Sequence, residues 1–326
     1  MIIARMPVRI SLGGGGTDLP FFASRHGGFV LSVALDKYAY VIINRPTLDS
    51  RIRVKSHVSE ETDSVNALKN DLVRAALIHA GIHDSIEVTF LSDVADGTGL
   101  GTSGAYAVGL MQTLYHYKNV TLDRHTLAEY AAALEMDILK RPVGKHDQYM
   151  AAFGGLRLLR IAPNGKVVVE DPPVDRTTLE NLKHGIGLFY TGVRHDSAAI
   201  LGKQKELSEH DPRVTAYYHT IKQIGEDVYS ALVTGNLTAF GELLHAHWSA
   251  KRNLSGVSDP YFDKIYEGAR AHGAIGGKLV GAGGGGFFMF YSSPQQKSIL
   301  RDWLASTYKF REIPFSYDWE GAVLLH

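Results

Sequence analysis

Short apolar runs in the first half of the chain predict a β-sheet. Four runs rich in Val, Ile and Tyr, bounded by Gly, Asp or Pro, predict strands at 2–12, 29–35, 39–44 and 85–91. Residues 59–71 are polar and acidic, and residues 72–80 have the pattern of a short helix. Apolar side chains then recur at helical spacing after Gly104 and again from about Asp123 to Leu139, which predicts two further helices.

The second half contains longer amphipathic stretches and fewer strands. A predicted hairpin at 154–161 and 166–170 is followed by a linker-like sequence at 171–178, so we place a domain boundary near Lys183. Beyond it, the pattern predicts strands at 186–190 and 287–291 and helices around 214–234, 237–253, 261–272 and 295–306, followed by terminal strands. Residues 203–213 form a charged segment without an assigned element. Because strands and helices mix without regular alternation, we predict an α+β fold with two domains, 1–183 and 184–326.

Composition narrows the range of functions. The chain has 326 residues, 45% of them hydrophobic, and its 34 Lys and Arg balance 34 Asp and Glu. Without net charge, no global field attracts nucleic acid or an anionic membrane, so any recognition of phosphate must be local. The absence of cysteine excludes disulfides, thiolate metal sites and a cysteine nucleophile, and fits a cytoplasmic protein. The sequence predicts neither a membrane span nor a signal peptide.

The 34 glycines are concentrated in clusters, and the central cluster predicts a nucleotide site. GTGLGTSGA follows a predicted strand and opens a predicted helix, where free backbone N–H groups and the helix dipole favour a polyphosphate. A plain glycine-rich turn is the alternative, although four glycines in eight positions with two hydroxyls favour the nucleotide site. The predicted ATP-binding residues are Gly97, Gly99, Leu100, Gly101, Thr102, Ser103 and Gly104.

Two other nucleotide-binding folds match this cluster less well. Gly99, Gly101 and Gly104 satisfy the G-x-G-x-x-G pattern of dinucleotide-binding folds. That fold requires a second strand ending in an acidic residue after the helix, whereas Asp123 here begins another helix. A Walker loop is excluded because no Gly-Lys pair at the required spacing precedes Ser or Thr.

Acidic residues near the central cluster are candidates for metal binding and catalysis. Glu135 lies about 80° from Leu127 on a helical wheel and so borders the buried stripe. A magnesium ion carried by ATP would be a suitable partner for this acid, with Ser103 as a second ligand; an ordinary ion pair is the alternative. Asp147 follows the helix-ending Pro142 on a predicted loop, where it could orient or deprotonate an attacking hydroxyl. A cap or turn aspartate is the alternative.

The first and third glycine clusters are candidates for substrate binding. Glycines after Arg9 would let a sugar lie against bare backbone, while Asp18 accepts two hydroxyls and Arg9 neutralises phosphoryl charge. A tight turn at the first cluster and a bulge or hairpin at the third are the alternatives. The third cluster, from Gly276, is predicted to form a glycine loop before a strand. The candidate contacts are Gly13, Gly14, Gly15, Gly16, Thr17, Asp18, Gly283 and Gly284.

A phosphorylated acceptor would require a cationic pocket apart from the ATP loop, because charge-assisted hydrogen bonds to phosphate need Arg or Lys. The candidates are Arg194, next to His195, and Lys251 with Arg252. Local ion pairs, for example with Asp196, are the alternative role for these residues. The histidines lack zinc-binding spacing, so no protein-held zinc is predicted.

All three glycine motifs, in this order, resemble those of the GHMP kinases, the galactokinase, homoserine, mevalonate and phosphomevalonate kinase superfamily. PVRISLGGGGTD resembles the substrate motif, GTGLGTSGA the ATP loop and KLVGAGGGGFF the C-terminal glycine motif. The chain departs from the family at Ala95 and Asp96, where proline is usual. Within the superfamily, RISLGGGGTDLP, GKHDQYMAAFGG, HWSAKRNLS and GGKLVGAGGGGFF are most similar to the D-glycero-D-manno-heptose 7-phosphate kinases.

The resemblance implies an N-terminal domain like domain 2 of ribosomal protein S5 and a ferredoxin-like C-terminal domain, with ATP and acceptor meeting between them. It implies magnesium-dependent phosphorylation of the anomeric hydroxyl of a heptose 7-phosphate, for nucleotide-activated heptose and capsule or lipopolysaccharide synthesis. Matched by motif position, Asp147 is the catalytic aspartate with Arg9 near it, Ser103 and Glu135 are the magnesium ligands, and Asp18 contacts the sugar. Another acceptor, such as fucose or galactose, and a non-catalytic sugar- and ATP-binding sensor stay open as alternatives.

Overall fold

Two sheets organise the computed structural model, which describes residues 1–194 and 196–325. Within these residues the larger sheet contains β1 (Ile2–Gly13), β2 (Gly28–Asn44), β3 (Ile52–Lys55), β4 (Glu60–Thr62), β5 (Ile86–Ser92), β6 (Leu156–Ile161), β7 (Val167–Glu170) and β12 (Val323–Leu325). The smaller sheet contains β8 (Ile186–Tyr190), β9 (Ala274–Leu279), β10 (Phe287–Ser292) and β11 (Arg311–Glu312). All pairings between these strands are antiparallel except that of β3 with β5. The predicted α+β class is confirmed.

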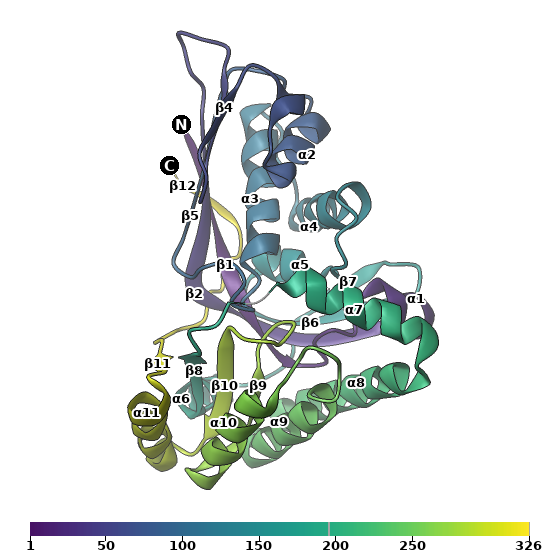
Figure 1. Cartoon of the computed structure of the whole chain (residues 1–326), viewed down its shortest axis with the longest axis vertical. Coiled ribbons are helices and arrows are strands. Elements are labelled where there is room, and N and C mark those ends of the chain that lie inside the picture. The colour runs from purple at the N-terminus through teal and green to yellow at the C-terminus, as the bar shows by residue number, and fades with distance from the viewer. Residues whose placement is uncertain (195, 326) are drawn as a thin grey trace.

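The paired strands β1 and β2 connect the upper and lower parts of the molecule (Figure 1). The chain forms one continuous strand where the sequence predicts two, at 29–35 and 39–44. The register against β1 shifts at 36–37, between the pairs Val8–Leu35 and Pro7–Tyr38, which marks a bulge rather than an end. Residues 28–35 are buried on both faces of the strand. Val30 and Ala34 pack in the apolar core of the upper part, whereas Phe29 and Leu31 pack in that of the lower part.

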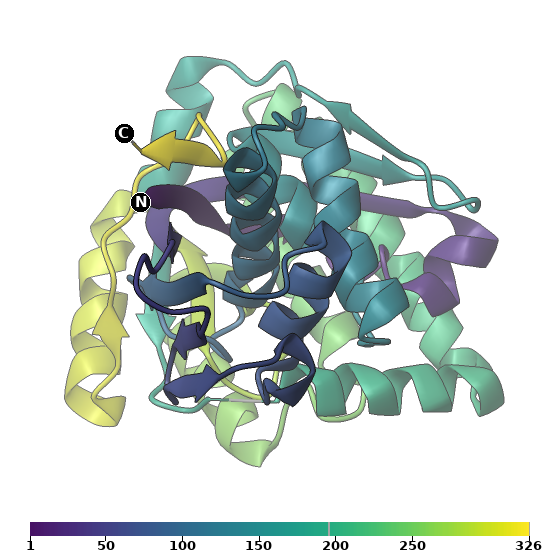
Figure 2. The same ribbon diagram turned by 90° about the horizontal axis from the view of Figure 1, so that it is seen from above.

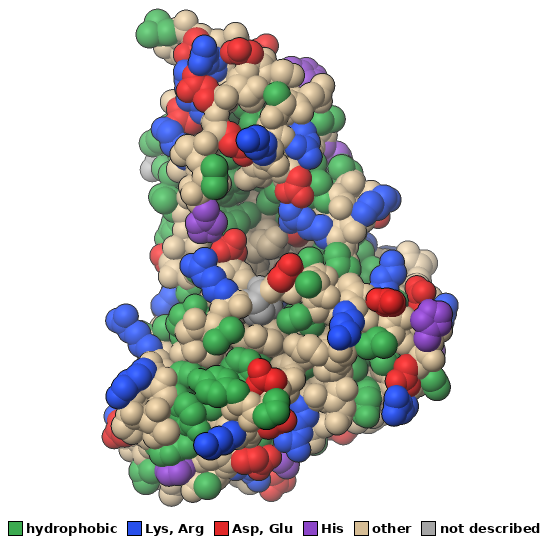
Figure 3. Space-filling view, in the orientation of Figure 1, with side chains coloured by type: hydrophobic (Ala, Val, Ile, Leu, Met, Phe, Trp, Pro, Cys, Tyr) green, Lys and Arg blue, Asp and Glu red, His purple; other side chains and the backbone are tan. Residues whose placement is uncertain are grey.

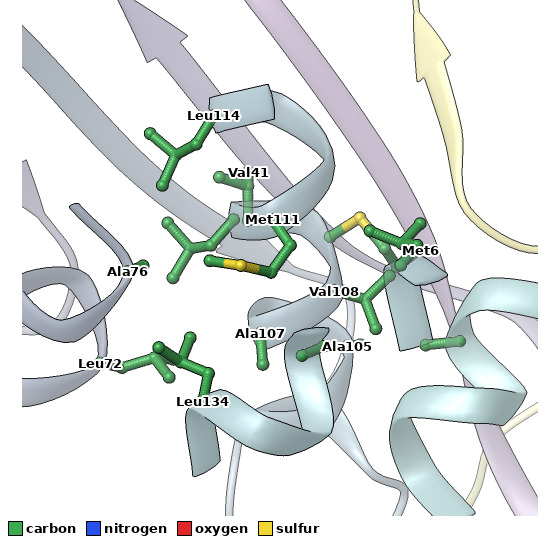
Figure 4. Close-up of a cluster of buried hydrophobic side chains, with 14 of the residues drawn as sticks. Met6, Val41, Leu72, Ala76, Ala105, Ala107, Val108, Met111, Leu114 and Leu134 are labelled. Carbon is green, nitrogen blue, oxygen red and sulfur yellow. The ribbon is translucent and has the colours of Figure 1, made fainter. Parts of the chain in front are cut away.

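Helix α3 forms the centre of the upper part. Four helices pack in this part: α2 (Asp71–Ala80), α3 (Thr102–Tyr117), α4 (Arg124–Ala133) and α5 (His146–Phe153), with a 3₁₀ turn at Val65–Ala67. Helix α1 (Pro20–His26) instead contributes Phe22 to the aromatic cluster of the lower part. Figure 2 shows α2, α3 and α4 grouped beside the strands. Side chains of α3 such as Val108 and Met111 lie in one apolar cluster with Met6 and Val41 of the sheet (Figure 4). A methyl group on Gly109 would overlap Met6, so glycine allows this close contact.

The lower part packs helices against the smaller sheet. These helices are α6 (Arg176–Gly185), α7 (Ser197–His210), α8 (Pro212–Val233), α9 (Leu237–Lys251), α10 (Pro260–Ala271) and α11 (Pro294–Tyr308). Their contact with the sheet is rich in aromatic side chains, including Trp248, Phe288 and Phe290. The last strand, β12, returns to pair with β1, so the predicted second domain contributes one strand to the larger sheet. None of the helices in the described ranges is long and apolar enough to span a membrane.

Several sequence-based assignments were wrong in their details. The charged segment 203–213 lies mostly in α7, whose helical pattern is weak because only Gln204 is fully buried. The linker-like segment 171–178 already contains the start of α6, which Asp175 caps. The helix predicted over 123–139 changes to a π-helix, η2 (Leu134–Ile138), after α4.

The third glycine cluster was also assigned only partly correctly. Gly276 and Gly277 lie within β9, where contact with α9 and with Phe290 leaves no room for side chains. The glycine loop that precedes β10 therefore begins only at Gly281.

Candidate active site

A cavity of about 660 Å³ lies where the upper and lower parts meet. Figure 3 shows basic and acidic side chains interspersed over this face of the molecule. The lining residues come from β1 and the turn after it, the loop after β5, the start of α3, η2 and the loop after it, α5, α7, α9, and β9 with the residues that follow it. This volume and this mixed lining are typical of sites for small molecules.

The cavity brings together most of the predicted site residues. Those that line it are Arg9, Gly15, Gly16, Asp18, Gly97, Gly99, Gly101, Thr102, Ser103, Gly104, Glu135, Asp147, Arg194 and Lys251. The remaining predicted residues, all within the described ranges, lie outside the lining: Gly13, Gly14, Thr17, Leu100, Gly283, Gly284 and Arg252. His195 lies outside the described residues.

The central glycine loop presents the open N-terminus of α3 to the cavity. Gly97, Gly99 and Gly101 have φ angles of 68°, 86° and 82°, a conformation that side chains disfavour. Gly101 is the N-cap of α3, and no side chain caps the helix there. The first amides of α3 are thus available to an anion, which the helix dipole also favours. Leu100 instead points into the core, and its carbonyl accepts a hydrogen bond from the backbone N–H of Arg9 at 2.9 Å.

The third glycine cluster supports this loop. A Cβ atom on Gly99 would overlap the carbonyl oxygen of Val280, and one on Gly281 would overlap Gly99. The two loops therefore touch through bare backbone. Gly283 packs against Val257, and the N–H of Gly284 donates to the carbonyl of Val257 at 2.9 Å. In this structure, the third cluster positions the central loop, and its predicted substrate contacts at 283 and 284 lie away from the cavity.

In the first glycine cluster, some residues pack in the interior and others line the cavity. Gly13 packs against α8, where a Cβ would lie 3.0 Å from the Cα of Gly225. Thr17 is fully buried, and its hydroxyl lies 2.8 Å from the carbonyl oxygen of Gly14 and 2.9 Å from that of Phe29. These residues fix the turn, which leaves Gly15, with its neighbours Gly16 and Asp18, facing the cavity.

Arg9 and Asp147 form an ion pair at the centre of the cavity. Nη2 and Nε of Arg9 donate to Oδ1 of Asp147 at 2.6 and 2.8 Å, and Nη1 donates to the carbonyl of Gly99 at 2.6 Å. Burial alone would raise the pKa of Asp147, but the charge and hydrogen bonds of Arg9 outweigh burial and lower it. Asp147 is the second residue of α5 rather than a loop residue as the sequence suggested. Its carboxylate is thus ionised and held by a guanidinium that also touches the glycine loop.

Asp18 and His146 form the wall beside this pair. Oδ2 of Asp18 accepts a hydrogen bond from the backbone N–H of His146 at 3.0 Å, and a Cβ on Gly144 would overlap the same oxygen. Burial raises the pKa of Asp18 to about 6, with a further contribution from the charge of Asp147. Asp18 therefore stays protonated to higher pH than an exposed aspartate does.

The hydrogen bonds of His146 determine its tautomer. Oγ of Ser32 donates to the carbonyl of Ile10 at 2.6 Å, so it accepts from Nε2 of His146 at 2.8 Å. The reverse arrangement would leave two acceptors facing each other at 2.6 Å, much closer than the 3.4 Å between Nδ1 of His146 and Oδ1 of Asp147. Burial lowers the pKa of His146 to about 3, so the ring is neutral and Nδ1 carries a lone pair. This nitrogen lies 3.4 Å from Oδ1 of Asp147, and a ligand hydroxyl could donate to it.

Glu135 is buried in η2 with a complete set of polar partners. It is 2% exposed, and Oε1 accepts hydrogen bonds from Ser103 at 2.9 Å and from Arg141 at 3.1 Å. Nε2 of Gln148 donates to its other oxygen at 2.6 Å. Burial nevertheless raises the pKa of Glu135, because these partners only partly replace water. The two predicted magnesium ligands, Ser103 and Glu135, are therefore in direct contact.

The candidate phosphate-binding residues occupy different environments. Arg194 lines the cavity, but its side chain is largely exposed. Its Nη1 lies 4.0 Å from Oδ1 of Asp96. Arg252 donates to Glu267 at 3.2 Å, outside the lining. Lys251 is buried and lines the cavity. Of the three, Lys251 has the most restricted position.

Sequence reasoning missed several residues that line the cavity, among them Ser11, Arg141, His146, Gln148, His247 and Lys278. Two of them flank Asp147 directly in the sequence, and this adjacency was a usable signal. Lys278 was detectable as a single charge within an otherwise apolar and glycine-rich strand. Arg141 offered no comparable signal, because it follows the irregular π-turn.

Comparison with known proteins identifies a family. The family models for the GHMP kinases N-terminal and C-terminal domains match residues 66–155 and 228–309. The D-glycero-alpha-D-manno-heptose 7-phosphate kinase of Campylobacter jejuni is 26% identical, and the match covers 92% of this chain and 91% of that protein. The L-fucokinase/L-fucose-1-P guanylyltransferase of Bacteroides fragilis is 25% identical over 92% of this chain, which spans 36% of that longer protein.

A solved structure supports the fold. The D-glycero-D-manno-heptose 1-phosphate kinase from Bacteroides thetaiotaomicron superposes with a TM-score of 0.81 at 24% identity. The superposition covers 100% of this chain and 99% of that one. The two-part arrangement of sheets and helices described above is thus shared over the whole length.

Proposed function

We propose that this chain, which belongs to the GHMP kinase family and is an ATP-dependent sugar kinase like its Campylobacter jejuni relative, uses a heptose 7-phosphate as its acceptor. The reaction would transfer the γ-phosphoryl group to the anomeric hydroxyl and give the 1,7-bisphosphate. The observation that carries this proposal is the match to the Campylobacter jejuni heptose 7-phosphate kinase over nearly the full length of both chains. The product would serve the synthesis of nucleotide-activated heptose for capsule or lipopolysaccharide, in the cytoplasm where ATP is available.

The geometry around Asp147 suits transfer to a hydroxyl. In our proposal the acceptor oxygen forms a bond to the γ-phosphorus while the bond to the ADP oxygen breaks. Asp147 accepts a hydrogen bond from the attacking hydroxyl and orients it, and it takes up the hydroxyl proton late, as the new bond forms. Because Arg9 lowers the pKa of this carboxylate, Asp147 is a weak base. Positioning and charge stabilisation by the Arg9–Asp147 pair would therefore matter more than early proton removal.

The N-terminus of α3 would hold the polyphosphate. Its uncapped amides and the three glycines with positive φ form a backbone surface that an anion can approach closely. Gly99 would also connect the two proposed substrate sites, because its carbonyl accepts a hydrogen bond from Arg9. The sugar would lie between Asp18, Nδ1 of His146 and the backbone of Gly15 and Gly16.

Magnesium binding by Ser103 and Glu135 is part of the same proposal. The donor set fits the ion, since a carboxylate and a hydroxyl are hard oxygen ligands. This proposal is supported by the hydrogen bond from Oγ of Ser103 to Oε1 of Glu135 at 2.9 Å, since both residues line the cavity. When bound, magnesium would neutralise charge on the ATP phosphates. The remaining ligands would come from phosphate oxygens and water, because the described residues form no cluster of three or more acidic or histidine ligands.

The test is ATP turnover with a panel of acceptors: heptose 7-phosphate, unphosphorylated heptose, fucose and galactose. We expect the highest kcat/KM with heptose 7-phosphate, and phosphorus NMR should show a new phosphate on C1. Preference for fucose would instead support the activity suggested by the Bacteroides fragilis relative. Binding of ATP and sugar without turnover of any acceptor would favour a sensor and contradict the proposal.

A further inference from the structure

Two lysines form a buried basic wall of the cavity that the proposed roles above leave unexplained. Lys251 at the end of α9 is 8% exposed, and Lys278 in β9 is 2% exposed. Both line the cavity. Lysine is rarely buried to this extent unless it is paired with a negative group.

Neither lysine has an acidic partner within the described part of the chain. Nζ of Lys251 donates to the carbonyls of Leu279 at 3.0 Å and Gly281 at 2.6 Å. Nζ of Lys278 has one polar neighbour, Nδ1 of His247, at 3.5 Å. His247 is itself buried and cannot supply negative charge.

Burial and neighbouring positive charges disfavour the charged forms of both amines. Burial, together with the positive charge of Arg9, lowers the pKa of Lys251 to about 7. Burial, followed by the charges of Lys251 and Arg9, lowers the pKa of Lys278 well below its usual value. Without a negative partner, buried amines of this kind lose their protons rather than keep a buried charge. An anion in the cavity would instead favour the charged forms by pairing with both amines.

A purely structural role accounts for only one of the two. The hydrogen bonds of Lys251 tie α9 to the start of the third glycine loop, so that residue could serve packing alone. Lys278 makes no comparable bond to the backbone, and its amine faces the cavity with a neutral imidazole beside it. A methionine would fill the same space without a buried charge, so the amine of Lys278 needs another explanation.

We propose that Lys278 and Lys251 form a phosphate-binding site in the wall of the cavity. This proposal depends on the proposed kinase function only in naming the molecule that carries the phosphate. The source of the phosphate is either the phosphoryl group during transfer or the phosphate that the acceptor already carries. Lys251 contacts Gly281, which packs on Gly99, whose carbonyl binds Arg9, so both sources lie within the same region.

Direct binding tests the site without knowledge of the acceptor. Inorganic phosphate is titrated calorimetrically into wild type, Lys278→Met and the exposed control Lys264→Met at about pH 8, in two buffers of different ionisation enthalpy. We expect wild type and control to bind phosphate with uptake of protons, since the anion favours the charged amines. The Lys278→Met variant should bind at least roughly tenfold more weakly, the loss of one charged hydrogen-bonded contact, and take up fewer protons. Equal affinity and proton uptake in all three proteins would overturn the proposal.

Steady-state kinetics then distinguish the two sources. If the site binds the acceptor phosphate, Lys278→Met raises KM for the phosphorylated sugar and leaves KM for the unphosphorylated sugar unchanged. If the site stabilises the phosphoryl group in transfer, kcat falls for both acceptors while both KM values stay near wild type. A variant that keeps wild-type kinetics with both acceptors would contradict the proposal. Because the titration uses phosphate alone, a wrong acceptor assignment would not affect it.

Discussion

Replacing Asp18 by asparagine should stabilise the protein at neutral pH while impairing acceptor binding. Asp18 is 7% exposed, and burial raises its pKa from 3.8 to about 6. Between these pH values the folded state binds this proton while the unfolded chain has released it, so the free energy of unfolding falls as pH rises. Above about pH 6 the folded protein carries the full cost of the buried, ionised Asp18. Because its pKa rises by about 2, this cost lowers the free energy of unfolding by about 3 kcal/mol.

Asparagine removes the charge and keeps the shape. Its side-chain oxygen can still accept the hydrogen bond from the N–H of His146. We expect Asp18→Asn to exceed wild type in stability by about 1 kcal/mol at pH 4.5 and by about 3 kcal/mol at pH 7.5. At roughly 2 °C per kcal/mol, Tm at the higher pH should rise by about 6 °C. The sugar would lose an ionised acceptor, so KM for the acceptor should increase.

Differential scanning fluorimetry across this pH range measures the effect. Asp227→Asn, which removes an exposed carboxylate from α8, serves as the control and should follow wild type at every pH. A difference between Asp18→Asn and wild type that stays constant with pH would show that the charge of Asp18 is not the cause. Lower stability of the variant at pH 7.5 would refute the reasoning outright, because a buried unpaired charge would then be favourable.

Three further substitutions test the proposed chemistry. Asp147→Asn should remove most turnover, by roughly 100-fold or more, while ATP still binds; unchanged turnover would exclude its proposed role. Glu135→Gln should raise the magnesium concentration needed for half-maximal rate, because an amide is a weaker ligand for a hard cation; a titration identical to wild type would make Glu135 purely structural. Gly99→Ala should weaken ATP binding, measured calorimetrically, because φ is 86° there and the new methyl would overlap Val280; wild-type affinity would contradict this role of the loop.

The sequence predicted elements best where the apolar pattern was strong. The helices α8, α9, α10 and α11 and the strand β10 lie within a few residues of their predicted limits. Helix α7 was missed because most of its residues contact solvent, so no apolar stripe marked it. The continuity of β2 was missed because the polar pair at its bulge resembles a turn in sequence.

Site residues followed a similar rule. Motif position identified Asp147, Glu135 and the central glycines, and the packing of α3, η2 and α5 brings them to one cavity. It did not distinguish Gly15 from Gly13, because which glycine meets a ligand and which meets α8 depends on packing between distant segments. Lys278 was missed for the same reason, since the wall it shares with Lys251 forms only when β9 packs beside α9.

The long strands β1 and β2 limit how the enzyme can close over its substrates. Both strands run through the upper and lower parts, and one stretch of β2 packs in both cores. If the upper and lower parts moved apart as rigid bodies, the shared stretch of β2 would have to leave one of the two cores. Opening and closing of the cavity should therefore depend on its peripheral elements, such as the exposed helix α7. Single-molecule distance measurements between the two parts should accordingly change little on ATP binding, while a probe on α7 should respond.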